Sequence, residues 1–232
     1  MLAFAAILAA AGPTQAQPLA LPAHDSRYKL ASDVQVDRAD GAVQKALEQV
    51  KAYLAAQQWD EAVETLLRVM EGSGNKLVGV TERRFVSVRD FCHLQLASLP
   101  PEALAAYRRR ADPLAKKWFE EGVAHRDSRL LAQVLNQAFV SSWGDDALLA
   151  LGEIALESGD YAAARAYWEK ILPVEVPPGQ PRTWLCVPDT DLDLAAVRAR
   201  LVLASILEGS SDRARDEDRK STRLNSSHVS ES

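Results

Sequence analysis

The sequence predicts an all-α protein built as a solenoid of helical hairpins, and three observations support this fold class. Alanine, leucine, glutamate and arginine dominate the chain, whereas β-branched and aromatic residues are sparse, so intrinsic propensity favours helices. Apolar residues recur at intervals of three and four along most of the length, as in amphipathic helices. A helix-turn-helix pattern also occurs near both ends of the helical part. The chain is 47% hydrophobic and 25% charged, which is enough apolar sequence for one domain with a substantial core.

The first sixteen residues, MLAFAAILAAAGPTQA, form one apolar stretch that ends in small residues. Thr14 and Ala16 stand where the −3 and −1 residues of a signal-peptidase site stand, so residues 1–16 are predicted to be a signal peptide cleaved before Gln17. The alternative is a buried or amphipathic first helix, but the run has no polar face. We therefore expect an exported protein, periplasmic or extracellular, with no membrane span in the mature chain.

Residues 17–39 carry two prolines, Pro18 and Pro22, and no sustained periodicity, which predicts an extended linker. The helical domain is expected to begin near Asp40. Its first hairpin has apolar stripes over 42–56 and again from Trp59 to Met70, with Gly72 and Gly74 closing the second helix.

The second clear hairpin is GDDALLALGEIALESGDYAAARAYWEKILP, residues 144–173. Gly152 lies inside a good helical pattern, where glycine is unfavourable unless close helix packing requires it. Gly159 and Asp160 then make the turn, and Trp168 is predicted to be a buried knob. The small residue, the Gly-Asp-aromatic turn, the following alanine and the later large residue resemble the tetratricopeptide repeat. That resemblance implies a tetratricopeptide-like helical-hairpin solenoid. Trp59, Ala62 and Leu66 match the same positions less well, with Gln57 in place of the glycine.

The region between these hairpins predicts irregular helices rather than two further perfect repeats. Trp59 and Tyr161 are 102 residues apart, or three periods of 34, but Leu96 and Leu130 fall where a small alanine is required. The periodicity predicts helices over about 80–97, 101–110, 112–124 and 127–140, with breaks at Pro100–Pro101 and Asp112–Pro113.

A Pro-rich insert is expected at 173–190, followed by a helix from Leu192 to Leu207 that ends the 40–207 repeat domain. Residues 208–217 are predicted to be the start of a truncated repeat helix. The string DRKSTRLNSSH, from Asp218, resembles the translation of a common sequencing adaptor, so 218–232 are predicted to be a non-native tail; the alternative is a polar disordered tail. We expect 208–232 to be poorly ordered, and the 192–207 helix to expose more apolar surface than the 144–172 pair.

Composition argues against several functions. The net charge of −5 supplies no broad cationic surface for nucleic acid. Two cysteines, Cys92 and Cys186, could form one disulfide or pack as separate thiols. The histidines show no metal-ligand spacing, and Cys92 and His93 point in different directions on a helix. Phosphate-binding, hydrolase and zinc-protease motifs are absent from the sequence. We therefore predict no enzyme activity, catalytic residue, metal or cofactor for this chain.

Three further sets of residues, the aspartates before the last helix, a basic run and the tryptophans, each have a functional and a structural interpretation. Asp189, Asp191 and Asp193 alternate before a helix, and helix N-capping by Asp191 or a neighbour fits better than a calcium loop. Five basic residues could contact an acidic partner, or could be a solvated helix face near a C-terminus: Arg108, Arg109, Arg110, Lys116 and Lys117. The tryptophans could line a groove, but helical spacing favours packing for Trp59 and Trp168.

The blocks RDFCHLQLASLPPEALAAYRRRADPLAKKWFEEG and LLALGEIALESGDYAAARAYWEKILP resemble the N-terminal helical region of exported planctomycetal proteins that carry a PQQ-binding-like β-propeller. The resemblance implies a scaffold or protein-binding module, with a protein partner or a downstream domain as its ligand. Two other hypotheses are the structural region of a quinone-dependent dehydrogenase-like enzyme and of a lytic transglycosylase-like enzyme. Propeller blades or a lysozyme-like block in the full-length gene would separate them.

Overall fold

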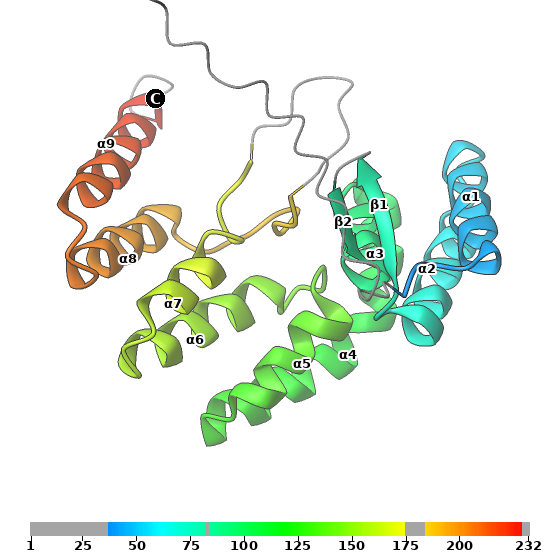
Figure 1. The fold of residues 1–232 in the computed structure, drawn as a ribbon, viewed down its shortest axis with the longest axis horizontal. Coiled ribbons are helices and arrows are strands. Elements are labelled where there is room, and N and C mark those ends of the chain that lie inside the picture. Colours follow the sequence, from blue (N-terminus) through cyan, green and yellow to red (C-terminus); the bar gives the residue numbers. More distant parts are fainter. Residues whose placement is uncertain (1–36, 82–83, 175–183, 229–232) are drawn as a thin grey trace, which may run out of the picture. The chain divides into compact units, whose positions relative to one another are not determined.

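The computed structural model describes residues 37–81, 84–174 and 184–228, and most of these are helical (Figure 1). This confirms the mostly helical prediction. The helices are α1 Gly41–Ala55, α2 Trp59–Ser73, α3 Val88–Leu96, α4 Pro101–His125, α5 Ser128–Ala138, α6 Gly144–Glu157, α7 Tyr161–Trp168, α8 Leu194–Leu207 and α9 Ser211–His228. No helix in the described ranges combines the length and the apolar character needed to cross a membrane. The predicted signal peptide and nearly all of the predicted linker lie outside these ranges.

A small β-hairpin interrupts the helices and corrects the prediction of a helix from residue 80. Strand β1, Leu77–Thr81, pairs antiparallel with β2, Arg84–Ser87, with Val78 opposite Val86. The segment LVGVT and the segment RFVS concentrate β-branched and aromatic residues that are scarce elsewhere, and such residues favour strands. The Ser87 hydroxyl then accepts a hydrogen bond from the Asp90 amide and caps the start of α3.

Four helix pairs in the described chain, α1–α2, α4–α5, α6–α7 and α8–α9, are joined by the same turn (Figure 1). In α6–α7, the Gly159 amide donates to the Leu156 carbonyl at 3.0 Å and the Asp160 amide donates to the Ala155 carbonyl at 2.9 Å. These two bonds define a Schellman motif, which needs a left-handed residue after the helix. That residue has a positive φ in all four turns: Gln57, Arg126, Gly159 and Gly209.

The shared turn gives the hairpins one register. Five residues after each left-handed position lies a buried side chain: Ala62, Leu131, Ala164 and Ala214. A strict 34-residue period places Leu130 at this position, which is one residue too early, because the α4–α5 turn does not keep that period. The larger Leu131 fits because it faces Gly122, where a Cβ would lie 2.9 Å from the leucine Cγ.

The α6–α7 pair confirms the predicted close packing. Trp168 is fully buried, and its indole lies so close to Gly152 that any Cβ there would collide with the ring nitrogen Nε1. The same nitrogen donates a 3.4 Å hydrogen bond to the Leu149 carbonyl. The prediction that Trp168 is a buried knob is therefore confirmed, although α7 ends at Trp168 rather than at Pro173.

Helix α4 is continuous across Pro113, so the predicted break between 101–110 and 112–124 is wrong. Proline removes one helical hydrogen bond and clashes with the preceding turn, which usually kinks or ends a helix. Here the packing of α4 against α2, α5 and α6 holds it in one piece. Asp112, expected at the break, instead accepts hydrogen bonds from the Ser142 amide at 3.0 Å and the Ser142 hydroxyl at 2.9 Å.

The C-terminal segment also differs from the prediction, because α9 extends to His228 instead of being poorly ordered from residue 208. Ala214 and Glu217 are buried, and ion pairs three residues apart link Asp212 with Arg215 and Glu217 with Lys220. Residues 218–220 are exposed, so this part of the helix adds nothing to the core. The prediction that the tail is non-native stays a prediction.

Helix α8 does expose more large apolar side chains than the 144–172 pair, as predicted. Leu203, Ile206 and Leu207 are 43%, 58% and 47% exposed, and no large apolar residue of α6 or α7 reaches such exposure. The apolar edge of α8, defined by these three residues, is therefore left uncovered by the described chain.

Candidate functional site

The basic run of α4 lies in the middle of the helix rather than at its end. Helix α4 runs from Pro101 to His125, so Arg108, Arg109 and Arg110 are more than a dozen residues from the C-terminal carbonyls. The prediction that the run lies near a helix C-terminus, where cations compensate the helix dipole, is therefore wrong, since that effect is confined to the last turn. The side chains of Arg109 and Arg110 are exposed, as expected of a solvated helix face. Consecutive residues on a helix point in directions about 100° apart, and the three arginines accordingly reach different neighbours.

Arg108 binds the C-terminal end of the predicted Pro-rich insert. Its guanidinium forms two hydrogen bonds with the Asp189 carboxylate, one of them at 3.0 Å, and its Nε donates to the Val140 carbonyl at 3.3 Å. Such two-point pairing fixes the orientation of both groups. Arg110 instead reaches Asp60 on α2 at 3.2 Å. Among the described residues, Arg109 has no charged or hydrogen-bonding partner, and its side chain is exposed.

Asp145 fixes the next residue of the same segment. The Thr190 hydroxyl donates a 2.6 Å hydrogen bond to Asp145, which lies in the first turn of α6 and is buried. Burial raises the pKa of the Asp145 carboxyl above its ordinary value, because desolvation disfavours the charged form and outweighs the Thr190 hydrogen bond. Arg108 and Asp145 thus anchor Asp189 and Thr190, the last residues of the insert, to α4 and α6.

The alternating aspartates have separate structural roles. Asp193 caps α8 by accepting a 2.9 Å hydrogen bond from the Ala195 amide, Asp189 pairs with Arg108, and Asp191 is exposed. N-capping is thus confirmed, at Asp193 rather than Asp191. No cluster of three or more metal-ligating side chains occurs in the described ranges.

Cys92 and His93 are buried side by side in sequence and do not act on each other. Burial raises the pKa of the Cys92 thiol to about 12 and lowers the pKa of His93 to about 4. The His93 ring faces the Asn136 carbonyl at 3.2 Å. Cys92 and Cys186 are both buried and are not joined to each other. A thiol that holds its proton so firmly is a poor nucleophile.

The tryptophans occupy three kinds of environment. Trp168 is core, and Trp59 is half-buried at the start of α2. Trp143 packs on Phe119 with ring centroids 5.2 Å apart, and the Lys116 ammonium lies 5.8 Å above its ring. Trp184, within the predicted insert, is 64% exposed. The prediction of core packing is therefore confirmed for Trp168, whereas Trp59 is only half-buried. Trp143 is half-buried beside the basic residues of α4.

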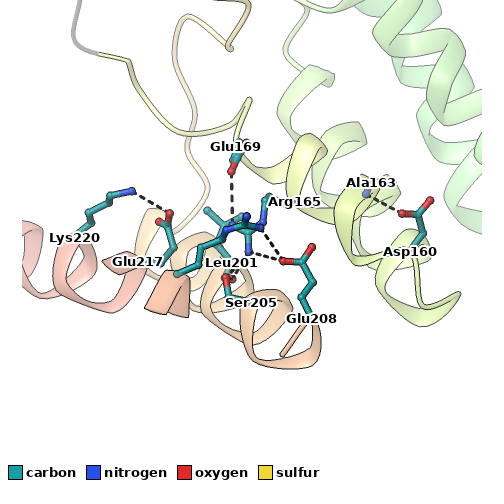
Figure 2. Close-up of polar contacts among 10 residues, drawn as sticks. Asp160, Ala163, Arg165, Glu169, Leu201, Ser205, Glu208, Glu217 and Lys220 are labelled. Carbon is teal, nitrogen blue, oxygen red and sulfur yellow. Dashed lines mark hydrogen bonds and ion pairs between the residues drawn. The ribbon is translucent and has the colours of Figure 1, made fainter. Parts of the chain in front are cut away.

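A buried polar cluster joins α7 to α8, and sequence reasoning missed it (Figure 2). Arg165 is only 8% exposed, and its guanidinium contacts the Ser205 hydroxyl, the Leu201 carbonyl at 3.4 Å and the Glu208 carboxylate at 3.5 Å. Glu208 also pairs with Arg213 of α9 at 3.0 Å. Because buried charges must be paired, this cluster specifies how the last helix pair docks on α7. Its one sequence signal is an arginine on the otherwise apolar side of α7.

Three adjoining hollows follow α4 and meet at Arg108. The first is lined mainly by apolar groups, including Leu99, Leu104 and Pro188. The second contains Asp145, Asp189 and Asp191. The third contains Arg108, Arg109, Lys116, Asp112 and Trp143. This combination of apolar, acidic and basic linings is the strongest candidate for an interaction site in the described chain.

Neither of two comparisons with known proteins identifies a relative of this chain. The chain matches no model of a known protein family, and no curated protein shows significant similarity to it.

Proposed function

We propose that this chain is an exported protein-interaction or scaffold module, a tetratricopeptide-like solenoid that forms the N-terminal part of a larger protein. The observation that carries the proposal is the repeated hairpin, closed at Gln57, Arg126, Gly159 and Gly209 by one turn geometry. Arrays of such units have stability that depends on neighbouring repeats, and they offer extended surfaces for partners.

The contacts between successive elements support an array. Helix α5 packs on α6, α7 packs on α8, and α4 also contacts α6. Ion pairs cross these junctions, since Arg126 in the second turn pairs with Glu157 and Arg200 of α8 pairs with Glu153. Each hairpin thus uses its neighbour to cover its surface, which is the principle of a solenoid.

The apolar edge of α8 supports placement in a longer protein. Leu203, Ile206 and Leu207 are exposed on the last described helix pair, whereas α4, the first helix of an earlier pair, also contacts the next pair through α6. The proposed continuation is a β-propeller-like region, as the sequence resemblance implies. In this proposal the module binds and positions other groups and catalyses no reaction itself.

Site-specific photo-crosslinking in the exporting cell tests the interaction role. A photoreactive residue at Ala105, exposed on the α4 face, should link to a discrete protein or to a downstream domain, whereas one at Ala162, exposed on α7, should not. Equal crosslinking from both positions, or none from Ala105, would contradict the proposal. A full-length gene that encodes a lysozyme-like catalytic block would favour the transglycosylase hypothesis.

Mass spectrometry of the mature protein tests export. The N-terminus should lie at Gln17, because Ala16 completes the predicted cleavage motif. Retention of Met1 in the mature pool would show that the leader is not removed.

A further inference from the structure

One stripe of α4 combines apolar and basic chemistry along its length. Residues spaced by three or four, and hence on one helix face, line the hollows at both ends of the stripe: Pro101, Leu104, Ala105, Arg108, Asp112 and Lys116. Ala105 and Arg108 line both hollows, so the two are continuous. The stripe offers an apolar site at its N-terminal end and a charged site towards its C-terminal end.

The charged end has an excess of cations. Arg108, Arg109 and Lys116 line that hollow together with one carboxylate, Asp112. Asp112 already accepts two hydrogen bonds from Ser142, and Arg108 is neutralised by Asp189. This leaves Arg109 and Lys116 as the cations directed at a ligand.

These two cations are available for binding. Arg109 has no polar partner among the described residues. Lys116 is 3.7 Å from Glu120, a long and exposed contact that contributes little. Its ammonium also lies over the Trp143 ring, which supplies a flat apolar wall beside the charge.

We propose that the α4 stripe binds a short acidic peptide segment in an extended conformation, with an apolar side chain in the Leu104 hollow and carboxylates at Arg109 and Lys116. This inference rests on the proposed interaction function and names its ligand. Seven helical residues separate the two cations, a rise of about 10 Å. Residues three apart in an extended peptide span the same distance, about 10 Å. The complementary motif is therefore two acidic residues three apart, preceded or followed at a similar interval by an apolar residue.

The neighbouring acids argue for a peptide rather than a nucleic acid. Asp145, Asp189 and Asp191 line the hollow on the other side of Arg108, and the whole chain carries a charge of −5. A continuous polyanion would meet these carboxylates, whereas a peptide can place its few charges only at the cations. Charge complementarity of this local kind gives specificity more than raw affinity.

Fluorescence polarisation with the full chain tests the inference. The probe is a fluorescein-labelled heptapeptide with leucine first and glutamate at its fourth and seventh positions, separated by serines; a reversed version covers the opposite orientation. The protein variants are Arg109→Glu with Lys116→Glu, and a control with Lys45→Glu and Lys51→Glu, which makes the same charge change on exposed residues of α1. A milder pair, Arg109→Gln with Lys116→Gln, guards against misfolding of the first variant.

The glutamate peptide should bind the native chain, and the α4 charge reversal should weaken it by about tenfold or more. The glutamine pair should weaken it less, and the α1 control should change affinity by less than about threefold. Equal losses in the α4 and α1 variants, or equal binding of a lysine-containing peptide or single-stranded oligothymidine, would overturn the inference. So would the absence of binding. If Ala105 still crosslinks a partner in that case, the interaction role stands and the acidic ligand is wrong.

Discussion

The hairpins α1–α2 and α6–α7 share a register, but residues of different size fill their equivalent buried positions. Aligned on Gln57 and Gly159, the first hairpin has Val50 and Leu66 where the second has Gly152 and Trp168, and all four are buried. Gly152 is smaller than Val50, and Trp168 is correspondingly larger than Leu66, so the summed side-chain volume changes little. Cores tolerate such exchanges when the total volume is kept, so the repeat is defined by its turn and its summed volume rather than by particular side chains.

The same alignment reveals a second difference. The buried Val43 and Val63 of the first hairpin correspond to the buried Asp145 and Arg165 of the second. Asp145 binds Thr190 at the end of the insert, and Arg165 binds Ser205 and Glu208 in the chain that follows it. The second hairpin therefore replaces apolar contact with directed polar contact at the point where the array is interrupted.

Among the substitutions that test this comparison, removal of the Trp168 side chain should have the largest effect on stability. Trp168→Ala should lower the free energy of unfolding by about 3 to 5 kcal/mol, because it leaves a cavity between α6 and α7. Urea unfolding followed by far-ultraviolet circular dichroism would measure it. A loss below about 1 kcal/mol would mean that Trp168 is not a core residue.

Exchanging volumes tests whether the two hairpins are equivalent. Gly152→Val alone should destabilise by about 3 kcal/mol, because its side chain collides with Trp168. The double variant Gly152→Val with Trp168→Leu recreates the Val50–Leu66 pair and should recover at least half of that loss. A double variant as unstable as the sum of the two single variants would show that the hairpins do not share one packing solution.

The partly buried ion pair between Arg165 and Glu208 is a further difference between the two hairpins. Glu208→Ala should destabilise by about 3 kcal/mol, because it leaves the buried Arg165 with fewer partners. Arg165→Met combined with Glu208→Ala should restore part of that stability, since it replaces the charge with an apolar side chain like Val63. If the double variant is no more stable than Glu208→Ala alone, the loss does not come from the uncompensated charge of Arg165.

Because Asp145 can ionise, it should make the stability of the protein depend on pH. Val43, at the equivalent position of the first hairpin, cannot ionise and should have no such effect. The pKa of Asp145 is raised in the folded state, so the folded protein binds its proton more tightly than the unfolded chain. Its contribution to stability is therefore fully present below its unfolded pKa and is lost as the pH rises through its folded pKa. Asp145→Asn, which keeps an oxygen acceptor for Thr190, should be more stable than the native chain at pH 7, and the difference should shrink towards pH 3. Parallel stability profiles would contradict this account.

The two hairpins also differ in how much of them the sequence could predict. Gly152, Gly159 and Trp168 were predictable, because a glycine in a helix, a Gly-Asp turn and a large residue at fixed spacing together indicate a close-packed helix pair. Helices over 112–124 and 127–140 were predicted, but the α4–α5 pair was not recognised as a repeat unit, because Arg126 occupies its left-handed position and Leu131 fills the alanine site. Both are exceptions that tertiary contacts, such as Gly122 against Leu131, make possible.

The candidate site was less predictable than the fold. The basic residues were identified, but the location of Arg108–Arg110 within α4 depended on Pro113, which local rules treat as a helix break. The pairing of Arg108 with Asp189 joins residues 81 positions apart, and no local pattern encodes such a contact. Only the fold shows that Arg109 and Lys116 are the cations left available.

The smallest expected effect lies in the turns, where the two hairpins differ by one residue. Gln57 has φ 57° and Gly159 has φ 79°, a region that is strained for side chains other than glycine. Gln57→Gly should therefore raise the free energy of unfolding by about 0.5 to 1 kcal/mol, and Gly159→Gln should lower it by about 1 kcal/mol. Ala56→Gly is the matched control: Ala56 has φ −85°, so glycine there should destabilise by adding freedom to the unfolded chain. Urea midpoints at unchanged m-value would measure all three. If Gln57→Gly is no more stable than the native chain, the glutamine conformation is not strained, and the equivalence of the two turns does not extend to their energetics.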